Sequence, residues 1–91
     1  MIDVTALLSE FLGTTFFVLS VLASGGNPLV AGGALALVIF LIARQSGGHV
    51  NPAVSTAMYL RGTLGLYEYL SYVASQLFGG ASALYLYRVF A

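Results

Sequence analysis

One stretch of the chain carries polar groups whose types and spacing could do chemistry. Residues 46–55 read SGGHVNPAVS and hold the single histidine, His49, followed by Asn51 and Pro52. Asn51 stands where a helix N-cap belongs, and Pro52 falls at the first helical position, where its missing N–H costs nothing. If the Asn51 side-chain oxygen caps that helix, its amide keeps two free donors. This pattern predicts hydrogen bonding to a polar ligand.

Nothing in the sequence indicates an active site or a metal centre. There are three acids, one histidine and no cysteine, and they form neither a nucleophile–base pair nor a metal-ligand cluster. We therefore expect no enzymatic activity, no cofactor and no metal. A lone loop histidine is more often an anchoring hydrogen bonder, and we interpret His49 in that way. The net charge of zero argues against a nucleic-acid partner.

The composition indicates an integral membrane protein. Of the 91 residues, 59% are hydrophobic and 7% are charged, whereas soluble domains carry about 25% charged residues. So few charges cannot provide a polar surface for a soluble domain. The first apolar run is too long, and too poor in basic residues at its start, for a cleaved signal peptide. We expect a multi-pass protein of the cell or plasma membrane.

The elements that must position the polar stretch are three apolar segments in one domain, residues 1–91. We expect transmembrane helices at about residues 4–24, 29–44 and 64–90, the second being short for crossing alone. Aromatic residues near both ends of the third segment suit two lipid–water interfaces: Tyr67, Tyr69 and Tyr72, then Tyr85, Tyr87 and Phe90. The expected fold class is an all-α membrane protein.

The polar stretch belongs to a segment, residues 46–60, between the second and third spans. Residues 51–60 would form about 15 Å of helix, half of the hydrocarbon thickness. A half-length helix after a glycine-rich loop predicts a re-entrant segment, whose loop backbone must be buried in protein or line a water-filled cavity. The partial positive charge of its N-terminus, about +0.5, would repel cations.

Together with two further motifs, this stretch resembles the aquaporin and glycerol-facilitator (major intrinsic protein) family. Residues 46–55 are similar to the family's first signature loop and residues 9–14 (SEFLGT) to its first-helix motif. Residues 74–79 (ASQLFG) resemble its third-helix motif AQ-x-x-G, with Ser75 as a departure. The family's fold has two inverted three-helix repeats. The chain resembles one of them, a first-half repeat with three transmembrane helices and one re-entrant NPA half-helix.

The resemblance implies roles for individual positions. Asn51, Pro52 and Ala53 would meet an opposing NPA motif at the pore centre, where Asn51 donates to the permeant. Backbone carbonyls of four loop residues would line the approach: Gly47, Gly48, His49 and Val50. Glu10 would accept hydrogen bonds from the loop backbone, since an acid in mid-span is costly and by default functional. Gln76 would also brace the loops.

The family's selectivity filter has no counterpart in the chain. In the family an aromatic residue on the second helix and an arginine after the second NPA motif build it. The corresponding offset here leads to Ala31, and Val54 stands three residues after Asn51. We therefore expect a wider, less cationic constriction that passes glycerol or urea along with water.

One repeat cannot enclose a pore, so the expected partners are the lipid bilayer and a second, inverted copy of the chain. This homodimer, with a tetramer of such pores as a further level of assembly, would conduct water or small neutral solutes passively. Arg44 and Arg61 on one side against Arg88 on the other give a feeble orientation bias. A small-residue stripe would allow close packing within or between chains: Ser71, Ser75, Gly79 and Ala83.

Two other classes of function remain open at this stage. The chain could be a non-conducting fragment, or a subunit completed by a separately encoded second half that carries the missing arginine. It could also be a small proton-coupled transporter with dual topology and Glu10 as its coupling carboxylate. The transporter leaves the NPA half-helix unexplained.

Overall fold

The computed structural model describes residues 3–91, which form four helices and no strand. They are α1 (Val4–Ala23), α2 (Pro28–Ser46), α3 (Pro52–Leu60) and α4 (Leu66–Phe90). The expectation of an all-α fold is confirmed for this part of the chain. The molecule measures 39 × 23 × 19 Å, so its long axis can cross a hydrocarbon core of about 30 Å.

Local capping groups explain where the helices begin. The Asp3 carboxylate accepts the Thr5 N–H at 2.9 Å and starts α1. The Asn27 side-chain oxygen accepts the Leu29 N–H at 2.9 Å, and Pro28 takes the first position of α2. These bonds satisfy N–H groups that have no partner within the helix.

Helix α2 extends slightly beyond the segment that the sequence predicts at about residues 29–44. It runs for 19 residues to Ser46, about 28 Å at the helical rise. The polar residues Arg44 to Ser46 continue the helix, which ends where Gly47 adopts φ +90°. The helix therefore ends in polar residues, beyond the apolar run.

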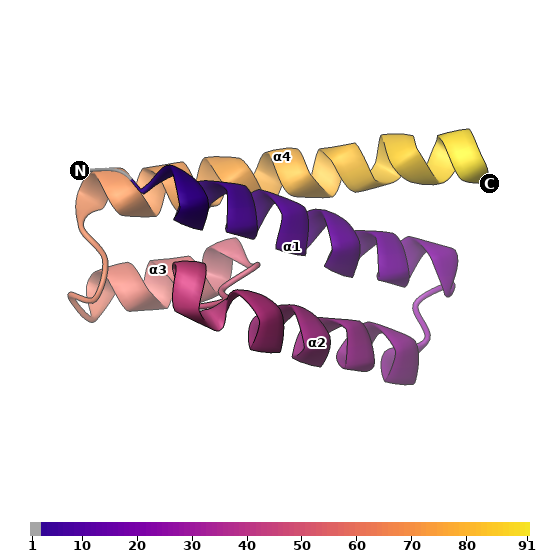
Figure 1. Ribbon diagram of the computed structural model, residues 1–91, viewed down its shortest axis with the longest axis horizontal. Coiled ribbons are helices and arrows are strands. Elements are labelled where there is room, and N and C mark those ends of the chain that lie inside the picture. The colour runs from indigo at the N-terminus through magenta and orange to yellow at the C-terminus, as the bar shows by residue number, and fades with distance from the viewer. Residues whose placement is uncertain (1–2) are drawn as a thin grey trace.

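Helix α1 lies between its two neighbours. It packs against both α2 and α4, while α3 packs against α4. Figure 1 shows that α1 and α4 run in the same direction and α2 returns in the opposite one. The short α3 occupies only one half of the long axis, at the end where α4 begins.

Two glycines allow the helices to approach closely. A Cβ atom on Gly13 would lie 2.9 Å from side-chain carbons of Val38 and Ile42, across the α1–α2 contact. A Cβ atom on Gly79 would lie 2.8 Å from the Phe11 carbonyl oxygen, across the α1–α4 contact. Part of the small-residue stripe of α4 therefore serves packing within the chain.

The interior is more polar than the surface. Seven polar or charged residues are buried: Glu10, Thr14, Thr15, Ser46, His49, Ser55 and Gln76. Large apolar side chains are exposed along the helices, including Phe40, Leu77 and Phe90. In water this arrangement would expose too much apolar area, whereas in a bilayer the exposed groups face lipid.

Helices α1 and α2 are long and apolar enough to cross a membrane. They are the candidate spans by length and composition within residues 3–91. Helix α4, expected as the third span, has 25 residues. Its tyrosines, serines and Gln76 make it less apolar than the other two.

Candidate functional site

The loop between α2 and α3 has backbone conformations that residues other than glycine rarely adopt. Gly47, Gly48 and Val50 have φ of +90°, +66° and +46°. Glycine tolerates this region, and a Cβ on Gly48 would also come within 3.2 Å of the Ile39 Cα. Val50 is β-branched, so a positive φ costs free energy there and must be held by its surroundings.

Glu10 of α1 holds the loop backbone in this conformation through hydrogen bonds. The side chain is 0% exposed, and its Oε1 accepts the Val50 N–H at 2.8 Å. Its Oε2 accepts the His49 N–H at 3.0 Å and the Ser46 hydroxyl at 2.6 Å. Gln76 of α4 donates its Nε2 to Oε1 at 2.8 Å. Four donors match the roughly four acceptor sites of an ionised carboxylate.

Gln76 connects the same cluster to α3. Besides Glu10, its Nε2 reaches the Ser55 hydroxyl at 2.8 Å. The His49 Nδ1 lies 2.9 Å from that hydroxyl. Gln76 therefore links α4 to α1 and α3 at one point, and the imidazole of His49 anchors the loop to α3.

The sequence analysis did not assign three members of this cluster to the site: Ser46, Ser55 and Tyr72. The Tyr72 hydroxyl donates to the Ser46 carbonyl at 2.7 Å, and its ring lies 5.0 Å from that of His49. The expectation that Tyr72 marks a lipid–water interface is wrong, because the side chain is only 6% exposed. Its spacing of four residues from Gln76 is the signal that could have placed both on one buried helix face.

The loop carbonyls differ from the loop N–H groups in their hydrogen-bond partners. The N–H groups of Gly48, His49 and Val50 are bound by Ser46 or Glu10. Within the described chain the carbonyls of residues 47–50 accept no hydrogen bond. The loop N–H groups therefore have partners within the described chain, whereas the loop carbonyls have none.

Asn51 continues this row with a donor. Its Oδ1 caps α3 by accepting the Ala53 N–H at 2.8 Å. Its Nδ2 has no acceptor among residues 3–91, and the side chain is exposed. Pro52 is half-buried and Ala53 is exposed. The NPA motif thus leaves an amide donor at the surface, beside the N-terminus of α3.

The two expected filter positions lie apart. Ala31 is half-buried in the first turn of α2, at the opposite end of that helix from the loop. Val54 is half-buried near the start of α3. Both are small or apolar, so neither adds a charge or a ring beside the loop.

Comparison of the sequence with known proteins identifies relatives of the chain. The model of the major intrinsic protein family matches residues 2–91. The chain is 35% identical to a chicken (Gallus gallus) lens fiber major intrinsic protein, over 88% of this chain and 36% of that protein. It is 43% identical to rat (Rattus norvegicus) aquaporin-8, over 78% of this chain and 31% of the relative.

A third relative extends the likeness beyond vertebrates. The chain is 39% identical to aquaporin A of Dictyostelium discoideum, over 89% of this chain and 37% of the relative. The chain therefore spans about a third of the length of these curated relatives. No solved structure matches it significantly. The family match over nearly the whole sequence shows that the chain belongs to the major intrinsic protein family.

Proposed function

We propose that this chain is one repeat of a passive membrane channel for water and small neutral solutes. The row of free groups at the loop carries the proposal: carbonyls of residues 47–50, then the Asn51 amide. A polar group without a partner at membrane depth costs several kcal/mol. Such a row is stable where water or hydroxyl groups supply the missing partners.

Family membership supports a channel in a membrane. Major intrinsic proteins are integral membrane channel proteins, so the chain is a membrane protein and not an enzyme. The plasma membrane as the particular location, and water or glycerol-like solutes as the particular permeants, belong to our proposal.

We assign three spans and one half-span to the proposed fold. Helix α3 has nine residues, about 13 Å, or half of the hydrocarbon core. Helix α4 packs against α1 and runs in the same direction, which supports it as the third span. The domain is then one first-half repeat over residues 1–91.

A barrier to ions follows from the same element. The N-terminus of α3 lies at the loop and carries a partial positive charge of about +0.5. The negative charge of Glu10 is compensated by its four hydrogen-bond donors. The carboxylate therefore does not offset the positive charge of the helix N-terminus beside the row of carbonyls. We therefore expect neutral permeants to pass the Asn51 position more readily than protons or other cations.

The proposed pore needs a second repeat. The exposed Asn51 and Ala53 would meet the same residues of an inverted second copy, and a tetramer of such pores is a further level of assembly. A separately encoded second-half chain is the alternative partner. In either case the second repeat supplies the half of the pore that α3 does not line.

The contacts of Glu10 weigh against a proton-coupled transporter. A coupling carboxylate must exchange protons with the transport pathway, but the oxygens of Glu10 are fully engaged and 0% exposed. They hold the loop, which agrees with a bracing role for Glu10 and Gln76.

Osmotic shrinking of protein-containing vesicles tests the proposal. Purified protein in liposomes should speed shrinking in a hypertonic sucrose solution, and an imposed proton gradient should leave the rate unchanged. Circular dichroism in the same vesicles checks that the helices have formed. Well-folded protein that shrinks no faster than empty vesicles would contradict the channel, and uptake driven by the gradient would favour the transporter.

A further inference from the structure

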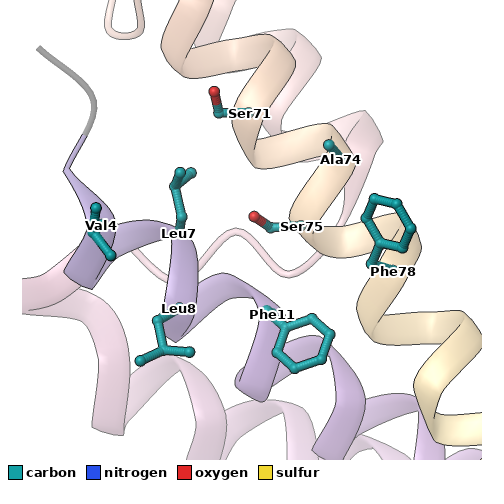
Figure 2. Close-up of a pocket in the computed structure, with 8 residues that line it drawn as sticks. All are labelled: Val4, Leu7, Leu8, Phe11, Ser71, Ala74, Ser75 and Phe78. Carbon is teal, nitrogen blue, oxygen red and sulfur yellow. The ribbon is translucent and has the colours of Figure 1, made fainter.

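A groove lies on the outer side of the contact between α1 and α4. Its volume is about 530 Å³. Figure 2 shows the lining side chains, which come from both helices: Val4, Leu7, Leu8 and Phe11 on α1, and Ser71, Ala74, Ser75 and Phe78 on α4. All of them are exposed or half-buried, whereas Glu10 and Gln76 of the same helices are buried. The groove therefore lies on the outer surface of these two helices, away from the loop cluster.

The groove is short and ends within the membrane. Phe11 and Phe78 are the last lining residues along α1 and α4, counted from the N-terminal ends of these helices. One residue after Phe78, Gly79 brings α4 against the Phe11 carbonyl. From Val4 to Phe11 the groove is roughly 10 Å long at the helical rise. One leaflet contributes about half of the 30 Å hydrocarbon core. The groove thus fits within a single leaflet.

These dimensions indicate what fills the groove. A stable protein–protein interface uses about 20–30 residues on each side, but eight residues line this groove. We propose that the groove binds an acyl chain of a glycerophospholipid from the leaflet at the N-terminal ends of α1 and α4.

The two serines give the groove a polar wall near its outer end. Ser71 and Ser75 make no side-chain hydrogen bond within residues 3–91, although Ser9 and Thr15 of α1 donate to carbonyls of their own helix. The Ser75 hydroxyl points toward α1 across the groove (Figure 2). A hydroxyl in apolar surroundings needs an acceptor, and a lipid ester at the outer end of the groove could supply one to Ser71.

The depth of Ser71 suits the ester carbonyl of a lipid. The exposed acid Glu68 caps α4 at Gly65 and must lie among the headgroups. Ser71 is three residues deeper, about 4–5 Å at the helical rise, close to the boundary between headgroups and hydrocarbon. An ester carbonyl accepts there, and the chain that it carries continues past Ser75 toward Phe11 and Phe78.

Photocrosslinking with a defined lipid tests this site. The crosslinking result does not depend on whether the protein conducts water. The probe is phosphatidylcholine with a diazirine in mid-chain, mixed into vesicles that hold the full protein, and mass spectrometry locates the crosslinks. We expect crosslinks to concentrate on Leu7, Phe11 and Phe78. Ser75→Leu and, independently, Ala74→Phe fill the groove and should lower them about tenfold. Ser71→Ala should lower them about fivefold, the equivalent of one net hydrogen bond.

Ala81→Leu is the matched control. Ala81 is exposed on α4 but does not line the groove, so crosslinking should be unchanged. Equal labelling of the second groove, about 270 Å³ between α1 and α2 at Leu12 and Leu41, would overturn a specific site. The chain has no cysteine, so disulfide formation between Ser75→Cys copies in vesicles would show a second copy in the groove, which also overturns the proposal.

Discussion

The Oε1 atom of Glu10 lies 2.8 Å from the backbone nitrogen of Val50, a residue that holds φ at +46°. One buried acid on the first helix thus fixes the backbone of a loop 40 residues later in the chain. The bond turns the Val50 N–H toward α1, and the loop carbonyls are left for other partners.

Replacing this acid should loosen the loop. In Glu10→Gln an amide NH₂ replaces one carboxylate oxygen, so one or two buried donors lose their acceptor, at about 1–3 kcal/mol each. We expect a lower apparent melting temperature in detergent, measured by circular dichroism, and slower osmotic shrinking. Glu68→Gln is the control, because Glu68 is exposed and only caps α4. An equal shift in both variants would contradict the bracing role.

Asn51→Asp separates capping from conduction. Aspartate caps a helix as well as asparagine does, so α3 should stay folded. The change removes the free NH₂ donor and adds a negative charge beside the row of carbonyls. We expect slower water flow and a measurable cation leak in dye-loaded vesicles. Asn27→Asp, at the Asn-Pro that starts α2, should change neither rate; similar effects of both variants would count against a pore at Asn51.

Adjacent glycines in α4 provide a paired test of the helix packing. A Cβ at Gly79 would meet the Phe11 carbonyl oxygen at 2.8 Å, while a Cβ at Gly80 would meet nothing within 4 Å. Gly79→Ala should therefore destabilise the α1–α4 contact by about 1–3 kcal/mol. Gly80→Ala should be neutral or stabilise the helix by about 0.5–1 kcal/mol. Unfolding in increasing sodium dodecyl sulfate measures both, and the opposite order would disprove the close approach.

Selectivity should respond to the two filter positions. Ala31 and Val54 lie apart within one chain, so in the proposed pore Ala31 of one copy would face Val54 of the inverted second copy. Ala31→Phe with Val54→Arg places a ring and a cation at this constriction and narrows it, so glycerol flow should fall more than water flow. The ratio of glycerol flow to water flow is measured from vesicle shrinking in glycerol and in sucrose. Ala36→Phe, at an exposed position of α2, is the control. Equal loss of both flows would mean that Ala31 and Val54 do not face the permeant.

Topology can be tested by shifting the balance of basic residues. Thr63→Lys adds a charge beside Arg61 at an exposed position, so all copies should insert in one orientation and conduction should stop. Val89→Lys, next to Arg88, should bias insertion the other way and restore conduction when both variants are co-expressed. Labelling of a C-terminal tag from each face reports the orientation. A uniformly oriented population that still conducts would rule out the inverted homodimer.

Local signals in the sequence were enough for the start of α3 but not for its surroundings. Asn51 and Pro52 act on groups two residues away, so their capping role can be read directly. Ser46 and Tyr72 form a hydrogen bond with each other although they lie 26 residues apart. No local pattern in the sequence indicates which distant groups form such a bond. The places of Glu10 and Gln76 followed from resemblance to a family, because a single acid or amide does not reveal its partners.

The span of the Glu10 contacts also bears on how the chain is made. The partners of this acid come 36 to 40 residues later in the loop, and 66 residues later at Gln76. A chain that leaves the ribosome in order therefore delivers a charged side chain to the insertion machinery well before any of its donors. Until the loop is made, Glu10 needs water or another polar partner beside it. Three of its four donors then come from residues 46–50, and Gln76 of α4, the last helix, supplies the fourth.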